Sequence, residues 1–465
     1  MNSPTNRLAV VGAGPAGLAA ALTAADHNIA VTLIDSAPQP GGQFYRQPAA
    51  ALGARRPQAL HHAWRTWARL RDRLGAHVAA GRIRHLPGRH VWFVEILDRG
   101  FILRTLTGDD EPEVFAADAV LLATGAYEKV LPFPGWTLPG VVTAGGAQAM
   151  LKGGLVLPGR RVVVAGSGPL LLPVATGLAA AGARLAALIE AADPRAYGRH
   201  ARTLAAHPGK LAEAAGYAGR LLRHRVPVLT RHTVVAAHGT DRVEAVTVAA
   251  LDADGRARPK TERRIACDTL AVGHGLLPHT DLAGALGCRT DPARVVVDAQ
   301  QRTDVPGVWA AGEAAGVGGA ALALAEGEIA GRSVVAHLTG ERPRTRSTAA
   351  NSRTALRKFA AVLDAVHTPP AHWAEQVADD TLVCRCEDVT AGAVRHAVTE
   401  LGAADLRTVK LLTRAGMGWC QGRVCGPGVA GVAGCPPETV RRPFARPVPL
   451  SVLARTPSPT EGRQE

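Results

Sequence analysis

Four cysteines near the carboxyl end of the chain stand in two close pairs, a pattern typical of a metal site. One residue separates Cys384 from Cys386, and four residues separate Cys420 from Cys425. If a small helical unit brings the pairs together, four thiolates can hold either a zinc ion or a [2Fe–2S] cluster. Zinc usually takes paired cysteines with at least about two residues between them. The spacing therefore favours the cluster, with zinc and free thiols as the alternatives.

A glycine-rich turn near the amino end could bind phosphates. Residues 8–35 read as a strand, a tight turn, a helix and a second strand that closes with an acidic residue. Such a turn needs one glycine for the sharp bend, one to admit a pyrophosphate and one for close helix packing. The helix N-terminus offers free N–H groups, and the closing acid can accept hydrogen bonds from an adenosine ribose. We therefore predict a dinucleotide site made by Gly12, Gly14, Pro15, Ala16, Gly17 and Asp35.

A second strand, turn and helix follow at residues 159–190. The turn is Gly166-Ser167-Gly168, and Glu190 is the closing acid. Leu171 stands where a third glycine is expected, so the helix should lie further from its strand and hold phosphate less well. A second bound nucleotide and a βαβ unit without a ligand are both left open.

Three further loops could let a flat ligand approach the backbone. One follows the first unit, one leaves a buried strand at residues 118–123, and one precedes a helix at residues 321–338. Small residues at strand exits and helix starts suit a bound nucleotide. The candidate residues are Gly42, Gln43, Thr124, Gly125, Gly312, Glu313, Gly319 and Ala320.

The elements that must position these residues alternate between strands and helices. We expect a hairpin at 91–96 and 101–106, another buried strand at 268–273 and an amphipathic helix at 352–366. Such alternation predicts an α/β fold with Rossmann-type parallel sheets. A chain of 465 residues is long enough for about three domains.

Composition narrows the class of protein. The formal net charge is +14, but no basic helix interleaved with aromatic residues is present, so we expect solvated arginine-rich faces and no nucleic-acid partner. Uninterrupted apolar runs of about 18 residues are absent, which predicts no membrane span. Residues 1–7 are short and polar rather than a signal peptide. We expect a cytoplasmic protein whose seven cysteines serve metal or redox chemistry.

The combined motifs of residues 8 to about 340 resemble the thioredoxin-reductase-like flavoproteins with two dinucleotide-binding domains. The motifs are GAGPAG, GGQ at 41–43, ATG at 123–125, GSGPLL and VPGVWAAGE. The resemblance implies a three-layer fold with FAD in the first domain and NAD(P) in the second, and Glu313 near the ribityl chain. Family members usually carry Glu at position 35 and Asp at position 313. A thioredoxin reductase also needs a redox CxxC in its second domain, and this chain has none.

The carboxyl-terminal motifs CRCEDVT and GMGWCQGRVCG resemble the [2Fe–2S] domain of bacterioferritin-associated ferredoxin (BFD). That resemblance implies four cluster ligands, Cys384, Cys386, Cys420 and Cys425. The two resemblances together predict an FAD-binding domain in two pieces at 1–150 and 290–340, a second dinucleotide-binding domain at 151–289, a linker and helix at 341–379, a BFD-like domain at 380–445 and a flexible tail at 446–465.

The order of these domains, with the run PFPGWTLPGVVTAGGAQ at 132–148, resembles the alpha-type subunit of heteromeric flavin-dependent amino-acid dehydrogenases. Opine oxidases, hydrogen cyanide synthase, hydroxyproline and proline dehydrogenases and part of sarcosine oxidase belong to that group. The resemblance implies an electron-transfer subunit, a beta-type partner with its own FAD that oxidises the C–N bond, in some cases a small ferredoxin-like subunit, and FMN at the alpha/beta boundary.

We find no catalytic residues in this chain and assign His274 and His279 a structural role. One alternative is a stand-alone NAD(P)H-dependent flavin oxidoreductase that uses the second turn. The other is a non-redox scaffold subunit, which four well-spaced cysteines do not favour.

Overall fold

The first of two parallel sheets carries the turn that begins at Gly12. The structure, a computed structural model, describes residues 6–291, 294–341, 347–436 and 442–455. Short apolar runs form strands buried on both faces, as parallel sheets require. The strands lie in the order β20-β7-β1-β2-β3. Their bounds are β1 Arg7–Val11, β2 Ala30–Ile34, β3 Ile83–Leu86, β7 Ala119–Leu122 and β20 Val308–Ala310.

Helices cover one face of this sheet and a small antiparallel sheet covers the other, so the unit has three layers. A Cβ at Gly327 of α8 would come within 2.1 Å of the Ala16 carbonyl oxygen on α1, so small residues allow these helices to pack closely. The hairpin predicted at 91–96 and 101–106 is confirmed by β4 and β5. The bounds are α1 Pro15–Asp26, α2 Trp64–Ala79, α8 Ala320–Thr339, β4 His90–Ile96, β5 Phe101–Leu106 and β6 Pro112–Ala117.

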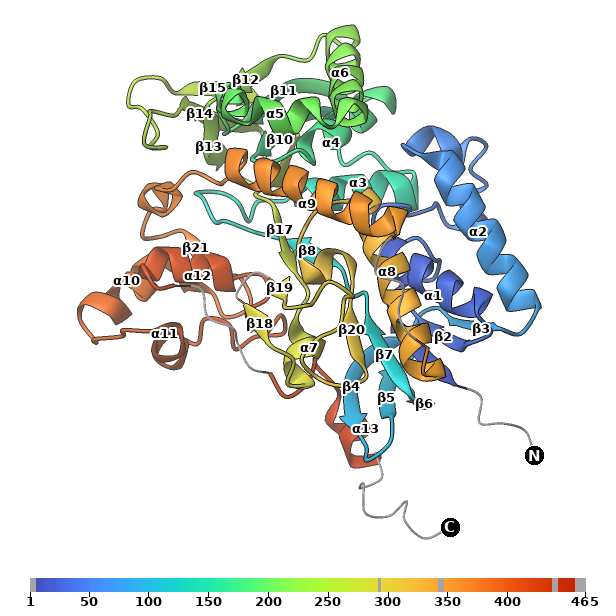
Figure 1. Ribbon diagram of the computed structural model, residues 1–465. Helices are drawn as coiled ribbons and strands as arrows, with labels where there is room; N and C mark the ends of the chain where they lie inside the picture. Colours follow the sequence, from blue (N-terminus) through green and yellow to red (C-terminus); the bar gives the residue numbers. More distant parts are fainter. Residues whose placement is uncertain (1–5, 292–293, 342–346, 437–441, 456–465) are drawn as a thin grey trace, which may run out of the picture.

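The second parallel sheet has the order β12-β11-β10-β16-β9 and lies at the top of Figure 1. Strand β9 pairs with β16, and α3 packs in the same core, so the predicted domain boundary at residue 150 falls inside α3. Phe133 and Trp136 also pack in the core of this unit, so we propose that it starts before residue 141. The bounds are β9 Val141–Thr143, α3 Ala144–Gly154, β10 Arg161–Gly166, α4 Leu171–Ala180, β11 Arg184–Glu190, α5 Ala201–Ala205, α6 Pro208–Arg223, β12 Val228–Thr230, β13 His232–His238, β14 Ala245–Ala250, β15 Arg263–Ala266 and β16 Thr269–Gly273.

A short two-stranded ribbon and one long helix connect the two units. Strands β8 (Ala126–Glu128) and β17 (Leu276–Pro278) pair antiparallel. The helix predicted at 352–366 is confirmed by α9 (Thr348–Val366), which crosses between the two sheets in Figure 1. Between β17 and β20 lie α7 (Asp281–Ala285), β18 (Thr290–Asp291) and β19 (Arg294–Val295). Although the predicted second domain extends to residue 289, α7 packs in the core of the first unit, so we assign α7 to that unit.

The carboxyl-terminal unit is small, mostly helical and packed beside both sheets (Figure 1). Its core is made of valines, alanines and two of the four paired cysteines. The predicted tail at 446–465 is not all flexible, because residues Leu450–Arg455 form helix α13. This helix is held in place by Val452, which is fully buried against Trp92 and Leu106. Residues 456–465 lie outside the described part of the chain. The other bounds are β21 Leu382–Cys384, β22 Val389–Thr390, α10 Ala391–Thr399, α11 Leu406–Thr413 and α12 Gly426–Ala433.

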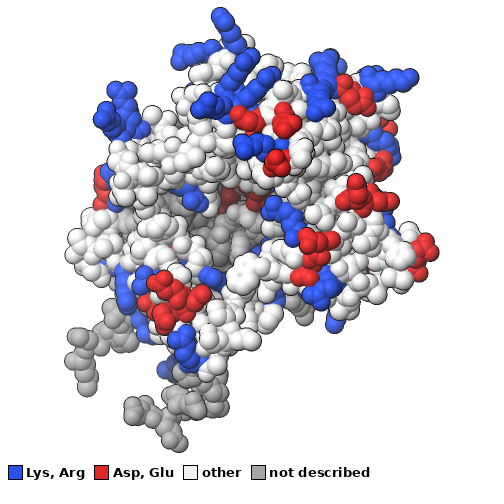
Figure 2. All heavy atoms as spheres, turned by 180° about the vertical axis from the view of Figure 1, so that it is seen from behind, with Lys and Arg blue, Asp and Glu red and all other residues white. Residues whose placement is uncertain are grey.

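Basic and acidic side chains are interspersed over the face in Figure 2, with arginines and lysines prominent at the top, where the second unit lies. The mixture of signs fits solvated faces rather than one basic track for a nucleic acid. In the described ranges, no helix combines the length and the apolar character needed to cross a lipid bilayer.

Candidate functional site

The first glycine-rich turn is closed so tightly that two of its glycines cannot carry a side chain. Gly12 has φ +106°, and a Cβ there would come within 2.3 Å of the Ala123 carbonyl oxygen. A Cβ at Gly17 would come within 1.8 Å of the Gly12 carbonyl oxygen. Helix α1 begins at Pro15, directly after Gly14, so its free N–H groups lie at the turn.

Asp35 closes the first unit as predicted, but its carboxylate already accepts two backbone hydrogen bonds. One oxygen accepts from the amide of Ala13 at 2.5 Å, and the other accepts from the amide of Ala37 at 2.7 Å. Burial raises the pKa of Asp35, and these two bonds oppose the rise. Each carboxylate oxygen has a further lone pair, so the group can still accept from a ribose hydroxyl.

The fold brings the other predicted loops to the same turn. A Cβ at Gly42 would lie 2.8 Å from Cα of Gly14, and one at Gly312 would lie 2.8 Å from Cβ of Ala16. Gln43 follows Gly42 and accepts hydrogen bonds from Arg46. Glycines of two loops that are far apart in sequence therefore lie against the first turn and α1.

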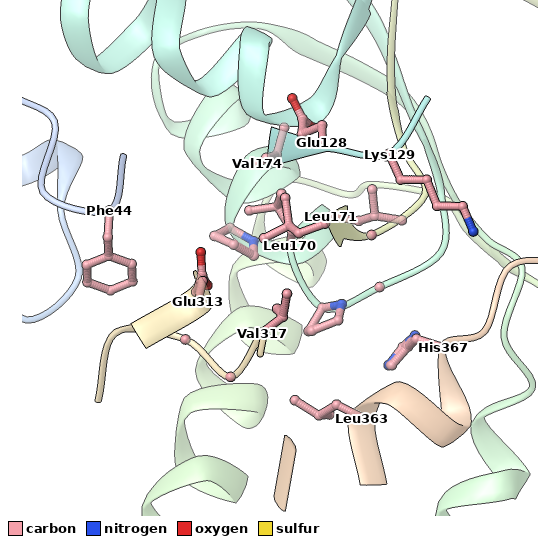
Figure 3. Close-up of a pocket in the computed structure, with 18 of the residues that line it drawn as sticks. Phe44, Glu128, Lys129, Leu170, Leu171, Val174, Glu313, Val317, Leu363 and His367 are labelled. Carbon is pink, nitrogen blue, oxygen red and sulfur yellow. The ribbon is translucent and has the colours of Figure 1, made fainter. Parts of the chain in front are cut away.

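Glu313 lines a cavity of about 2090 Å³ that also takes in residues of the second glycine-rich turn. Figure 3 shows Glu313 and Phe44 on one side of this cavity, with His367 and Leu363 from the segment of α9 on the other. Burial raises the pKa of Glu313, and a hydrogen bond from the Gly319 amide opposes the rise. Gly319 caps α8, which begins at Ala320, so this helix start faces the same space.

A half-buried lysine, not among the residues that we predicted, lines the cavity. Nζ of Lys152 lies 3.2 Å from the carbonyl oxygen of Phe44, to which it donates. Burial, together with the charge of Arg46, lowers the pKa of Lys152 to about 8. The amine therefore gives up its proton more readily than an exposed lysine does.

The second glycine-rich turn keeps its backbone shape but is capped by the chain itself. Gly166 has φ +136°, Gly168 has φ +130°, and α4 begins only at Leu171, three residues beyond Gly168. Oγ of Ser167 donates to the carbonyl oxygen of His367 at 2.7 Å. The segment after α9 therefore lies on the turn where a pyrophosphate would bind.

The closing acid of this second unit also faces His367. Oε2 of Glu190 lies 3.5 Å from Nδ1 of His367 and accepts from the amide of Gly168 at 3.3 Å. Nε2 of the same imidazole lies 2.6 Å from the hydroxyl of Tyr197. The predicted closing acid of the second unit thus lies beside protein groups.

The four paired cysteines lie together in the carboxyl-terminal unit. The Cys420 thiol interacts with those of Cys425 and Cys386, and the Cys425 thiol also interacts with that of Cys384. The hydrogen bond from Cys425, with amides of the loop adding to it, lowers the pKa of Cys420 to about 4, whereas the pKa of Cys425 is raised. A thiolate is the form that binds metal.

The contacts join the four thiols in a row, from Cys386 through Cys420 and Cys425 to Cys384. Among the described residues, no group of three or more His, Cys, Asp or Glu side chains is arranged to hold one metal ion. In a [2Fe–2S] cluster the four thiolates are shared between two irons, so an extended arrangement of thiols suits it. Two glycines make room: a Cβ at Gly418 would lie 2.2 Å from Cβ of Cys386, and one at Gly416 would lie 3.4 Å from Cα of Gly422.

Comparison with known families agrees with this arrangement. Residues 6–334 match the family model of pyridine nucleotide-disulphide oxidoreductases, which is well over half of the chain. The chain belongs to this family. Residues 382–432 match the BFD-like [2Fe–2S] binding domain. The protein is therefore an FAD-dependent oxidoreductase with an iron–sulfur domain, which confirms the predicted fold class and cofactors.

Two curated relatives match nearly the whole chain. It is 35% identical to the HcnB subunit of hydrogen cyanide synthase from Pseudomonas aeruginosa, over 90% of each chain. It is 34% identical to one subunit of the opine oxidase from Agrobacterium tumefaciens, over 90% of this chain and 83% of that one. The predicted resemblance to this group of oxidoreductases is confirmed. The solved structure of L-proline dehydrogenase from P. horikoshii has the same fold, with a TM-score of 0.64 at 20% identity over 98% of this chain and 81% of that one.

Several residues that shape the site were not among the site residues that we predicted from the sequence. They are Lys152, His367, Arg357, Glu326, Gly416 and Gly418. Only the two glycines, in GMGWC beside a predicted ligand, stood in a motif that could have pointed to them.

Proposed function

We propose that this chain is the electron-transfer subunit of a heteromeric amino-acid dehydrogenase of the D-amino acid, proline/hydroxyproline or opine type. A beta-type subunit with its own FAD would oxidise the C–N bond, and a small ferredoxin-like subunit or an FMN at the boundary could complete the assembly. FAD takes up electrons in pairs, whereas a [2Fe–2S] cluster carries one electron at a time. Together the two cofactors can therefore pass on an electron pair as two single-electron transfers. Both full-length relatives are named as subunits, which supports the need for a partner.

The observation that carries the proposal is the junction between the run 132–148 and the cluster-binding unit. Nε1 of Trp136 donates to the carbonyl oxygen of Leu382 at 2.6 Å, two residues before Cys384. The guanidinium of Arg385 lies 5.0 Å from the centre of the Trp136 ring. Trp136 belongs to the run 132–148 that marked the resemblance to alpha-type subunits, so this run docks the cluster-binding unit.

The capped second turn argues against the stand-alone NAD(P)H oxidoreductase. A dinucleotide at Gly168 would have to displace the His367 carbonyl from Ser167 and the imidazole from Glu190. Leu171 is 1% exposed and fills the position where a glycine would let helix and strand approach. The retained positive φ at both turn glycines is the observation that still favours a nucleotide there.

The first test is the visible spectrum and the metal content of the purified chain. We expect flavin bands with two irons and two sulfides per chain, as a [2Fe–2S] cluster requires. With the beta-type subunit present, one amino acid from a panel of prolines, D-amino acids and opines should bleach the flavin without oxygen. If NADH bleached the flavin of the isolated chain at a catalytic rate, the stand-alone NAD(P)H-dependent flavin oxidoreductase would be favoured. If the chain held zinc without sulfide, the non-redox scaffold subunit would be favoured.

A further inference from the structure

We infer that Asp281 is a positioning residue that holds the loop between Cys420 and Cys425 against the flavin-binding unit, and that this placement sets the rate of electron passage between the two units. The inference rests on the proposed function, because it assumes that electrons pass between them. Asp281 belongs to neither predicted cofactor site, and its contact with the cysteine loop would align the cluster site with the flavin site.

Asp281 is a buried carboxylate held between two arginines of the carboxyl-terminal unit. Its side chain is 6% exposed and lies at the first residue of α7. Oδ2 accepts a hydrogen bond from Nε of Arg423 at 3.0 Å, and Oδ1 accepts one from Nη1 of Arg442. Removing one partner of a buried ion pair leaves an uncompensated charge, so these three groups have strong reason to stay together.

Both arginines are at the same time bound to the loop that carries two of the cluster ligands. Arg423 lies between Cys420 and Cys425 in sequence and donates to the carbonyl oxygen of Ala445 at 2.7 Å. Arg442 donates to the carbonyl oxygen of Gln421 from Nε at 3.1 Å and from Nη2 at 2.8 Å. The two guanidinium groups therefore transmit the position of one carboxylate to the backbone of the loop.

On its other side, Asp281 follows a segment that is bonded to the strand exit predicted to contact the flavin. The amide of His279 donates to the carbonyl oxygen of Gly125 at 2.9 Å. Oγ1 of Thr124 donates to the carbonyl oxygen of His279 at 2.7 Å. A continuous chain of covalent and hydrogen bonds thus joins Thr124 through Asp281 to the cysteine loop.

Other contacts hold the carboxyl-terminal unit in place, so losing Asp281 should move the loop without releasing the unit. Trp136 bonds to Leu382, and Pro132 packs so closely on Gly428 that a Cβ there would come within 2.8 Å. These contacts lie on β21 and α12, away from Asp281. A displaced loop would change the separation and alignment of the cluster ligands relative to the flavin-binding unit, which should slow electron passage.

The test compares Asp281→Asn with Glu375→Gln in the full chain loaded with FAD and cluster. Glu375 is the matched control, because its ion pair with Arg256 also joins the carboxyl-terminal segment to another unit but is largely exposed. Deuterium uptake at the amides of 416–426 reports on the loop without any turnover. After a flash that reduces the flavin, the fading of the cluster absorption gives the passage rate.

For Asp281→Asn we expect unchanged flavin and iron content, faster exchange at 416–426 and a fall in the passage rate. Asp281→Glu, which keeps the charge, should recover part of the exchange protection and part of the passage rate. Glu375→Gln should change neither the exchange at 416–426 nor the passage rate. An unchanged exchange pattern and rate in Asp281→Asn would overturn the inference. If Asp281→Asn does not fold, Arg423→Lys takes its place with the same expectations, because a lysine cannot donate to Asp281 and to the Ala445 carbonyl oxygen as the two guanidinium nitrogens do. If the unmodified chain passes no electrons, the proposed function fails, and the exchange data alone then decide whether Asp281 positions the loop.

Discussion

Nε of Arg357 on α9 lies 2.8 Å from Oε1 of Glu326 on α8. The Glu326 side chain is fully buried, and its other oxygen accepts from the amide of Gly312 at 3.1 Å. Arg357 also donates to the carbonyl oxygens of Gly316 and Ala315. The Glu326 carboxylate therefore joins the turn at Gly312, beside the predicted flavin site, to helix α9. The far end of α9 covers the second glycine-rich turn.

Replacing Arg357 with methionine should destabilise the protein by about 3 kcal/mol, because Glu326 would lose its main partner in a buried site. Urea unfolding followed by flavin fluorescence measures the change. Arg357→Met combined with Glu326→Gln should recover part of the loss, since position 326 then no longer carries a buried negative charge. The control Arg332→Met removes an exposed pair with Glu328 and should cost less than about 1 kcal/mol. Equal losses in the two single variants would contradict the assigned role of Glu326.

The substitution Gly17→Ala should remove FAD from the purified protein. Its Cβ would meet the Gly12 carbonyl oxygen at 1.8 Å, so α1 must move away from the turn that we assign to the pyrophosphate. The flavin-to-protein absorbance ratio measures occupancy. Gly75→Ala on α2, where a Cβ meets nothing within 4 Å, should keep FAD and gain up to about 1 kcal/mol of stability. A Gly17→Ala protein with full flavin would refute this assignment.

The substitution Gly418→Ala should lower the iron and sulfide content while leaving the flavin bound. A Cβ there would lie 2.2 Å from Cβ of Cys386, so this cysteine would have to leave its place beside Cys420. Gly426→Ala at the start of α12 has open space around its Cβ and should keep the cluster. Iron and acid-labile sulfide assays on both proteins, normalised to flavin, decide the matter. Full iron in Gly418→Ala would argue against Cys386 as a ligand.

Acid should destabilise the protein partly through His274. Burial, together with the charge of Lys129, lowers the pKa of His274 to about 4. The unfolded chain, in which a histidine has a pKa of about 6.5, then binds the proton first as the pH falls. Stability is therefore lost between about pH 6.5 and pH 4, by up to about 3 kcal/mol from this residue.

Unfolding free energies of the wild type and His274→Gln, measured from pH 7 to pH 5, test this. The variant cannot take up the proton and should lose less stability over that range, whatever its stability at pH 7. His27→Gln, at an exposed position of the chain, should follow the wild type. Parallel curves for all three proteins would show that His274 does not titrate as proposed.

The amino-acid sequence determined the local features of both sites. A tight turn needs glycine within a few residues, so Gly12 and Gly17 could be identified without knowing what packs on them. The paired spacing of Cys384, Cys386, Cys420 and Cys425 favoured a cluster over zinc before any contact was known. Leu171 likewise signalled a weaker second turn, and α4 does begin later after its turn than α1 does.

Only the tertiary structure decided which groups meet across long stretches of chain. Ser167 and His367 are 200 residues apart, and Asp281 and Arg423 are 142 apart. Such pairs leave no periodic or local signal in the sequence. A hydrogen bond or ion pair needs only two polar residues, and polar residues are common on any protein surface. The path of the folded chain, rather than residue spacing, caps the second turn and ties the cysteine loop to the flavin-binding unit.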